Sequence, residues 1–311
     1  MHHALDAIGK TPLVRLRNLP GDDVAEIWVK YEGANPSGSM KDRMTLAMIQ
    51  GAERRGELLP GARIVEYTGG STGSSLAFVA AAKGYRMHVV TSDAFALEKR
   101  RTMRAYGAVV EEIPSDGGKV TPDLIPKMME RARELGRDAG SFMTDQFRNP
   151  DNVAAYGALA EEVEREAGLP DAFVAAVGTG GCFSGTADYL KSRNASIECV
   201  AVEPLTSRNL SGGKLGPHRL EGIGVGFMPP NMRMDLVDAI EAVSDEESFD
   251  TARRMAATDG VFAGITSGTN VTAALRVARR LGPGKRVLTI AVDTGLKYLA
   301  GDLYNVGDGP A

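Results

Sequence analysis

The chain has 311 residues, of which 43% are hydrophobic and 24% are charged, and its formal net charge at pH 7 is −4. A chain of this length can form two lobes with their own cores, and its slight negative charge gives no reason to expect nucleic acid or an anionic membrane as a partner. We find no apolar run of about 18 residues and no signal-peptide pattern. We therefore expect no membrane-spanning helix and a cytoplasmic location.

Cysteine and histidine are sparse in this sequence. The two cysteines are Cys182 and Cys199, and none of the four histidines has metal-ligand spacing or a nearby partner for a catalytic triad. We expect no metal site. We expect both cysteines to remain thiols in a reducing compartment and not to form a disulfide.

The segment 35–43, Asn-Pro-Ser-Gly-Ser-Met-Lys-Asp-Arg, predicts a loop followed by a helix over 41–51. Lys41 would lie in the first turn, where the exposed N–H groups carry partial positive charge. That charge disfavours an ammonium group and favours a neutral amine, which is a nucleophile toward a carbonyl carbon. The alternative is a solvated surface lysine.

Apolar, β-branched stretches alternate with amphipathic stretches along most of the remaining chain. Strands are predicted at 64–67, 87–91, 109–113, 173–177, 198–202 and 287–292, and helices at 74–83, 96–106, 123–135, 152–167, 247–258 and 269–280. This alternation is typical of parallel sheets with helices on both faces, so we predict an α/β fold with two doubly wound lobes. The pattern breaks near 140–150, where we expect the boundary.

Two glycine-rich turns each follow a predicted strand and open a helix. The first is Thr-Gly-Gly-Ser-Thr-Gly at 68–73, and the second is Gly-Thr-Gly-Gly-Cys-Phe-Ser-Gly at 178–185. Backbone amides and hydroxyls at a helix N-terminus bind carboxylate or phosphate, so we interpret the first turn as an anion site and the second as a phosphate site. The alternative is a dinucleotide-binding loop, with Glu203 as the acidic residue at the end of the next strand. Such a loop would need glycine at position 183, where this chain has Phe183, so the glycine spacing disfavours this alternative.

These motifs occur in one order and resemble, nearly end to end, the cysteine synthase family of fold-type II pyridoxal phosphate enzymes, which includes cystathionine β-synthase. Segments 8–16, 146–150, 210–218, 226–227 and 293–298 are also similar to family segments. The resemblance implies a tryptophan synthase β-like fold. It places a smaller, mobile lobe at 1–12 and 35–145 and a larger lobe that binds the cofactor phosphate at 13–34 and 146–311.

The resemblance also implies roles for individual residues. Lys41 would bind pyridoxal 5′-phosphate as an imine and later carry the Cα proton, and Thr266 would face the pyridine nitrogen. The cofactor phosphate would be bound by Gly178, Thr179, Gly180, Gly181 and Cys182. The substrate would be bound by Thr68, Gly69, Gly70, Ser71, Thr72, Gln146 and Gly222, with Ser71 also at the cofactor ring.

The implied reaction is β-replacement on an O-activated serine, such as O-acetylserine, with sulfide as nucleophile and cysteine as product, by way of an aminoacrylate. Other hypotheses are another donor or nucleophile, such as homocysteine or an amine, β-elimination as in serine and threonine dehydratases, and a non-catalytic cofactor-binding protein. The chain departs from the family pattern at Gly69 (usually Ser), Ser71 (usually Asn), Cys182 (usually Thr) and around Tyr156. The resemblance further implies a homodimer and a serine acetyltransferase partner whose tail enters the site.

Overall fold

The computed structural model describes residues 3–118, 121 and 123–305 and divides the chain into two compact units. Unit 1 comprises residues 1–8 and 41–152, and unit 2 comprises 9–40 and 153–311. The expected lobe boundaries followed residues 12, 34 and 145, whereas the units divide after residues 8, 40 and 152. Gln146 therefore belongs to unit 1 and not to the part that contains the second glycine-rich turn.

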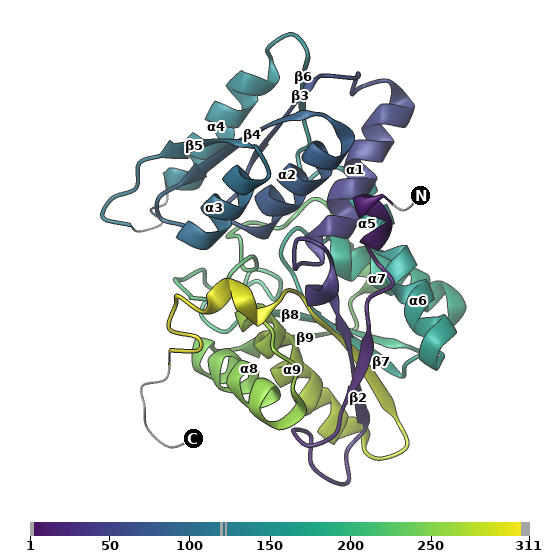
Figure 1. Ribbon diagram of the computed structural model, residues 1–311. Coiled ribbons are helices and arrows are strands. Elements are labelled where there is room, and N and C mark those ends of the chain that lie inside the picture. The colour runs from purple at the N-terminus through teal and green to yellow at the C-terminus, as the bar shows by residue number, and fades with distance from the viewer. Residues whose placement is uncertain (1–2, 119–120, 122, 306–311) are drawn as a thin grey trace. The chain divides into compact units, whose positions relative to one another are not determined.

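Unit 1 contains a four-stranded parallel sheet whose strand order is β5-β4-β3-β6 (Figure 1). Its strands are β3 (Arg63–Tyr67), β4 (Arg86–Ser92), β5 (Val109–Ile113) and β6 (Ser141–Met143). Its helices are η1 (Ala4–Ala7), α1 (Lys41–Arg55), α2 (Ser71–Lys83), α3 (Leu97–Ala105), α4 (Leu124–Gly136) and the start of α5 (Pro150–Ala154).

Successive residues of β3 and β4 pack against opposite layers of unit 1. Ile64 and Val89 join the core with α1, α2 and α3, whereas Val65 and Val90 join the core with α4. This follows from the two-residue period of a strand, and it explains why the strands read as continuous apolar runs.

Unit 2 contains a six-stranded sheet in the order β1-β2-β10-β7-β8-β9. Its strands are β1 (Leu13–Leu16), β2 (Glu26–Tyr31), β7 (Ala172–Ala176), β8 (Glu198–Pro204), β9 (Ala239–Val243) and β10 (Arg286–Ala291). Its helices are η2 (Glu32–Ala34), α6 (Gly157–Ala167), α7 (Gly181–Arg193), η3 (Met234–Leu236), α8 (Asp245–Asp259), α9 (Ile265–Leu281) and η4 (Gly295–Tyr298). Strand β1 is antiparallel to β2 and the other pairs are parallel, so the predicted α/β class with parallel sheets is confirmed.

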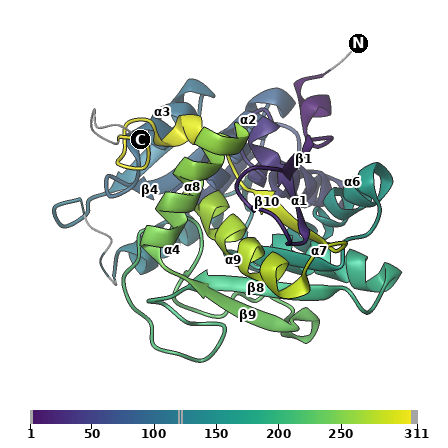
Figure 2. The same cartoon turned by 90° about the horizontal axis from the view of Figure 1, so that it is seen from below.

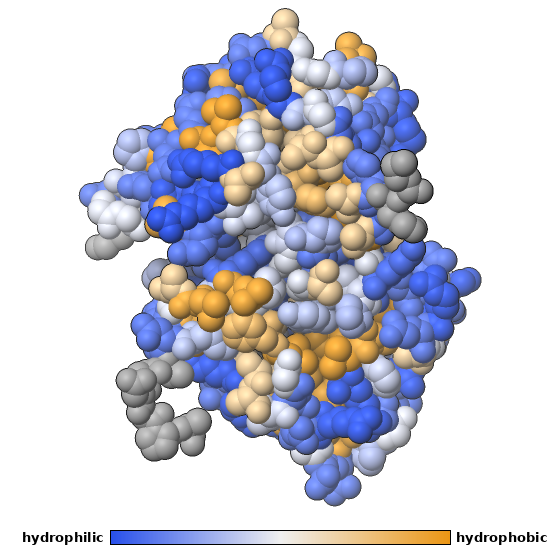
Figure 3. Space-filling view, in the orientation of Figure 1, coloured by the Kyte–Doolittle hydropathy of each residue, from blue (hydrophilic) through white to orange (hydrophobic). Residues whose placement is uncertain are grey.

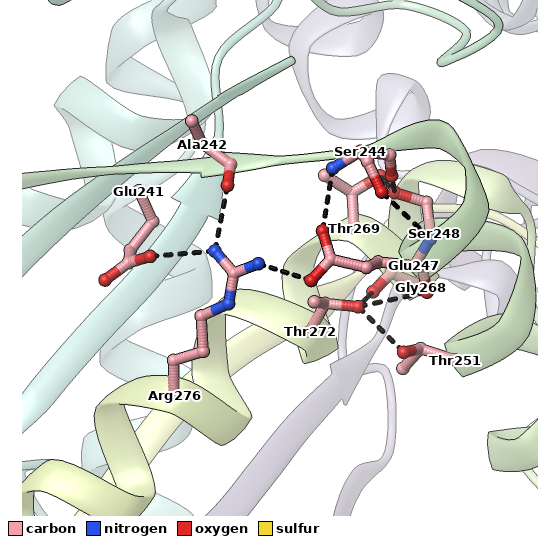
Figure 4. Close-up of polar contacts among 10 residues, drawn as sticks. All are labelled: Glu241, Ala242, Ser244, Glu247, Ser248, Thr251, Gly268, Thr269, Thr272 and Arg276. Carbon is pink, nitrogen blue, oxygen red and sulfur yellow. Dashed lines mark hydrogen bonds and ion pairs between the residues drawn. The ribbon is translucent and has the colours of Figure 1, made fainter. Parts of the chain in front are cut away.

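Helices α8 and α9 lie side by side in unit 2 (Figure 2), and polar contacts join them. Arg276 on α9 donates to the carboxylate of Glu241, to the carbonyl of Ala242 and to Glu247 on α8 (Figure 4). Ser244 and Glu247 also form a capping box at the start of α8. Nearer the start of α9, which carries Thr266, the hydroxyl of Thr269 donates to the hydroxyl of Ser248 on α8 at 2.9 Å.

The surface carries separate hydrophobic areas among hydrophilic side chains (Figure 3), and the exposed hydrophobic residues include Leu59, Leu296 and Leu299. None of the helices in the described part of the chain is both long enough and apolar enough to span a membrane.

Candidate functional site

Lys41 is the first residue of α1 and is partly buried. The backbone of the preceding residue is fixed on both sides within unit 2. The N–H of Met40 donates to the carbonyl of Val292 at 2.9 Å, and the hydroxyl of Tyr156 donates to the carbonyl of Met40 at 3.2 Å. Tyr156, at a departure from the family pattern, therefore holds the residue from which the lysine helix begins.

A buried polar network fixes the loop that leads to Met40. Glu32, which is 0% exposed, accepts one hydrogen bond from the hydroxyl of Thr11 at 2.6 Å and another from the side-chain amide of Asn35 at 2.8 Å. The side-chain oxygen of Asn35 accepts from the N–H of Gly9 at 2.9 Å. Sequence analysis missed the role of Glu32, because a lone glutamate after a stretch that was not assigned as a strand carries no signal.

The first glycine-rich turn connects β3 to α2 in unit 1, and α2 begins at Ser71. The hydroxyl of Thr72 donates to the side-chain oxygen of Gln146 at 2.8 Å. The hydroxyl of Thr68 accepts from the N–H of Gly70 at 3.1 Å. The structure therefore brings together Thr68, Gly70, Thr72 and Gln146, four of the residues predicted to bind substrate.

Side chains of the α3 segment pack directly on the glycines of this turn. A Cβ atom added at Gly69 would lie 2.4 Å from the ring of Phe95, and one added at Gly73 would lie 2.5 Å from the methyl carbon of Met103. Real Cβ atoms do not approach this closely, so packing excludes larger residues at Gly69 and Gly73 unless the neighbours move. A serine at position 69, which is usual in the family, would therefore clash with the ring of Phe95 in this structure.

Lys99 lies between these two contacts in the sequence, and it shares one face of α3 with Met103, four residues later. Its side chain is only 4% exposed, and its ammonium nitrogen is 3.6 Å from the position of a Cβ at Gly70. Sequence analysis missed Lys99, because a lysine in a charged helix is most simply a solvated residue.

Glu66, the residue two positions before Thr68, is fully buried in β3. Its carboxylate accepts hydrogen bonds from the hydroxyl of Thr144 and from the N–H of Gln146. The pKa of Glu66 is raised to about 7, because burial and, to a smaller extent, the nearby charge of Asp145 raise it more than its hydrogen bonds lower it.

The second glycine-rich turn connects β7 to α7 in unit 2, as predicted. Gly180 precedes the helix in the left-handed conformation, with φ of +85°, and a Cβ atom there would lie 2.6 Å from the backbone nitrogen of Met232. A Cβ at Gly178 would lie 2.1 Å from the carbonyl oxygen of Gly222. Glycine is thus required at Gly178 and Gly180, and the structure places the predicted Gly222 against this turn.

Thr266 is the second residue of α9 and is 4% exposed. Its hydroxyl donates to the carbonyl of Glu221 at 2.6 Å, so the oxygen of Thr266 keeps lone pairs for a further donor. Thr266 and the turn at 178–182 belong to unit 2, and Lys41 and the turn at 68–73 belong to unit 1.

The cysteines are consistent with the sequence interpretation. Cys182 and Cys199 are both buried and form no disulfide with each other. Burial raises the pKa of the Cys199 thiol to about 12, so this thiol is unreactive at neutral pH. Within the described ranges, no group of three or more His, Cys, Asp or Glu side chains could hold a metal ion.

Comparison with known proteins identifies the family to which the chain belongs. The sequence profile described as "Pyridoxal-phosphate dependent enzyme" matches residues 4–293. A cysteine synthase of Staphylococcus aureus is 42% identical over 304 residues, which cover 97% of this chain and 96% of that protein.

Two solved structures are also similar. The crystal structure of O-ureido-L-serine synthase superposes with a TM-score of 0.92 and 35% identity, and the match covers 100% of this chain and 97% of that one. The O-acetylserine dependent cystathionine beta-synthase of Helicobacter pylori has a TM-score of 0.89 and 39% identity, with 98% and 99% covered.

Proposed function

Because the chain belongs to the pyridoxal-phosphate dependent enzymes and, within them, to the cysteine synthase family of β-replacement enzymes, we propose that it makes cysteine from an O-activated serine and sulfide. The donor would be of the O-acetylserine type. The observation that carries the proposal is the position of Lys41 at the start of α1, directly after a residue whose N–H and carbonyl are both hydrogen-bonded.

The residues present fit the phosphate of the cofactor. The N-cap of α7 is Gly180, which has no side chain, and the hydroxyl of Thr179 accepts from the N–H of Gly181 at 3.5 Å, so this helix start combines backbone amides with a hydroxyl. Amides at a helix N-terminus bind phosphate well. We propose that Gly178, Thr179, Gly180, Gly181 and Cys182 bind the phosphate.

The residues around the cofactor ring also fit their proposed roles. Thr266 would donate its hydroxyl hydrogen to the pyridine nitrogen in place of the carbonyl of Glu221, and Ser71 would contact the ring hydroxyl. A hydroxyl at the nitrogen, unlike a carboxylate, does not hold that nitrogen protonated. When bound, pyridoxal phosphate supplies an electron sink for the bonds at the substrate Cα.

We propose that Lys41 acts as both the attachment point of the cofactor and the base. Its Nζ atom would hold the aldehyde carbon, and after displacement by the substrate amine it would accept the proton from Cα. Loss of that proton would allow the substituent on Cβ to leave with its bonding electrons, and after sulfide adds at Cβ, Lys41 would return a proton to Cα. The position of the amine at a helix N-terminus favours its neutral form, which both roles require.

The turn at 68–73 would bind the substrate carboxylate. The first-turn amides of α2 provide donors, and Gln146 holds the hydroxyl of Thr72 in place. Because Gly69 has no side chain, one contact that serine would make is absent, and Phe95 occupies the adjoining space.

Glycine at position 69, where the family usually has serine, favours a second candidate function. In this function the enzyme uses another donor or another nucleophile. The ring of Phe95 occupies the space in which a serine side chain at position 69 would lie. The names of similar structures include O-ureido-L-serine synthase and O-acetylserine dependent cystathionine beta-synthase, so related proteins combine different partners. We propose this candidate second, since the cysteine synthase of S. aureus matches the chain over almost its full length.

A matrix of donors and nucleophiles separates the candidates. The holoprotein would be mixed with O-acetylserine or O-phosphoserine and with sulfide, homocysteine or hydroxyurea, and the products identified by mass. Cysteine as the main product from O-acetylserine and sulfide supports the first proposal, whereas preference for another pair supports the second. Keto acid release without added nucleophile would indicate β-elimination, and the absence of any product would indicate a non-catalytic protein.

We also propose a homodimer and a serine acetyltransferase partner, on the resemblance to the family. Light scattering during size-exclusion chromatography tests the dimer. Competition between an acetyltransferase C-terminal peptide and the amino-acid donor tests the partner.

A further inference from the structure

A carboxylate lies buried directly beneath the substrate turn of unit 1 and has no role in the proposed reaction. Glu66 on β3 is 0% exposed, and its two oxygens accept three hydrogen bonds. The donors are the N–H of Tyr67 at 2.9 Å, the hydroxyl of Thr144 at 2.6 Å and the N–H of Gln146 at 3.1 Å. Two of these three donors lie on the chain segment that follows β6.

That segment also carries the side chain that reaches the substrate turn. The side-chain oxygen of Gln146 accepts from the hydroxyl of Thr72 at 2.8 Å, and its amide nitrogen donates to the carbonyl of Tyr67 at 3.4 Å. Asn152 donates to the backbone carbonyl of Gln146 at 2.7 Å. The side-chain amide of Gln146 is therefore oriented, and its backbone is bonded at both N–H and carbonyl.

We propose that Glu66 is a positioning residue for the amino-acid substrate, which acts by fixing Gln146 and, through it, the hydroxyl of Thr72. This inference rests on the proposed function, because it assigns substrate binding to Thr72 and Gln146. Glu66 itself does not contact the substrate.

The chemistry of the donors explains why a carboxylate is needed at this position. All three partners present hydrogen atoms, and a carboxylate offers acceptor sites on both oxygens. Glutamine has the same shape but directs an NH₂ group toward at least one of these donors, which leaves a buried donor unsatisfied. Above about pH 7, where Glu66 is ionised, its hydrogen bonds are also stronger than those of a neutral group. The segment 144–146 is thus held more firmly by glutamate than by its neutral isostere.

The alternative is that Glu66 stabilises unit 1 without affecting the substrate. A double-mutant cycle on the holoenzyme separates the two possibilities, with the variants Glu66→Gln, Gln146→Ala and the double variant. The affinity for the amino-acid donor is measured by titration of the cofactor absorbance, and KM and kcat are measured separately. Glu53→Gln serves as a control, since this half-buried glutamate on α1 accepts from Lys83 and Tyr85, away from the substrate turn.

We expect Glu66→Gln to weaken donor affinity about tenfold, with KM affected more than kcat and with cofactor content unchanged. Because both residues act through the same side chain, the double variant should bind the donor no more weakly than Gln146→Ala alone. Glu66→Asp, which keeps the charge, should recover part of the affinity. Glu53→Gln should leave the affinity unchanged.

Two results would overturn the inference: fully additive effects of Glu66→Gln and Gln146→Ala, or a Glu66→Gln variant with lower stability but normal donor affinity. Amide hydrogen exchange provides a readout that needs no turnover. If Glu66 positions Gln146, exchange in Glu66→Gln should become faster at 144–146 and at 71–73. If the wild-type protein binds no cofactor, the proposed function fails, and this exchange pattern still decides whether Glu66 orders the turn.

Discussion

The ring of Phe95 fills the space that a side chain at Gly69 would enter, with 2.4 Å between the position of a Cβ and the nearest ring carbon. Gly69 lies in the proposed substrate turn, and Phe95 lies just before α3. The two residues therefore behave as a pair, since a larger residue at one position requires a smaller one at the other. This pair gives a physical reason for the departure from the family sequence.

The pair predicts strong coupling between substitutions at Gly69 and Phe95. Gly69→Ser should lower the free energy of unfolding by about 1–3 kcal/mol in the wild-type background through overpacking, and by clearly less in a Phe95→Ala background. Urea unfolding of the four proteins measures the coupling. Gly157→Ser is a suitable control, because no atom lies within 4 Å of its Cβ position. Equal costs in both backgrounds would show that Phe95 does not restrict Gly69.

The hydroxyl of Tyr156 should contribute to stability through its bond to the carbonyl of Met40. Tyr156→Phe keeps the ring and leaves a carbonyl without this donor, so we expect a loss of about 1 kcal/mol in unfolding free energy. Tyr106→Phe is the control, because no hydrogen bond to the Tyr106 hydroxyl is found among the described residues. If the two variants unfold at the same urea concentration, the bond to Met40 contributes nothing.

Gly180 should tolerate alanine much less well than a glycine with a similar φ elsewhere in the chain. Gly284 has φ of +80° and open space around its Cβ position, whereas Gly180 has φ of +85° and meets the backbone of Met232. Gly284→Ala should cost about 1 kcal/mol in stability. Gly180→Ala should cost more and should weaken pyridoxal phosphate binding at least about tenfold, because the phosphate loop has to shift. Equilibrium dialysis against pyridoxal phosphate measures the cofactor affinity of both variants. Equal affinities of Gly180→Ala and Gly284→Ala would show that Gly180 does not contribute to the phosphate site.

Glu66 should make stability depend on pH between its unfolded and folded pKa values. Burial raises its pKa from 4.5 to about 7, so between these values the folded state holds a proton that the unfolded state has lost. Stability should therefore fall as pH rises through this window, by on the order of 3 kcal/mol at most from this group. Glu66→Gln removes the titration, so the difference in unfolding free energy between the variant and the wild type should shift in favour of the variant as pH rises. Parallel pH profiles would contradict this assignment.

The repeated units of the fold were predictable because their strands are buried on both faces and their helices are amphipathic. The strands β3, β4, β5, β7, β8 and β10 all lie near their predicted positions. The strands β1, β2, β6 and β9 were not predicted. Alternating charged residues such as Arg15 and Lys30 interrupt the apolar runs of β1 and β2, and the pairing that stabilises these strands comes from residues far along the chain.

The predicted helix at 152–167 is divided at Ala155 and Tyr156 into α5 and α6. Gly157, a poor helix former, begins α6, and Tyr156 bonds to Met40, which lies 116 residues earlier in the chain. No local pattern contains that partner.

The sequence indicated the candidate site residues, because their chemical types suggest cofactor and substrate binding. The structure adds the neighbouring residues that contact them. The glycine-rich turns follow β3 and β7 as predicted. Glu66, Phe95 and Lys99 were not recognised, since their significance depends on contacts with residues distant in sequence. The roles proposed for individual site residues remain predictions for the experiments above.

The most direct test of the account is to identify the lysine that carries the cofactor. Borohydride reduction of the purified holoprotein converts the bond between cofactor and amine into a stable single bond, and peptide mass spectrometry then locates the pyridoxyl group. We predict a single modified peptide that carries the group on Lys41, and no modified peptide in Lys41→Ala. A pyridoxyl group on a different lysine, or on none, would contradict the central claim.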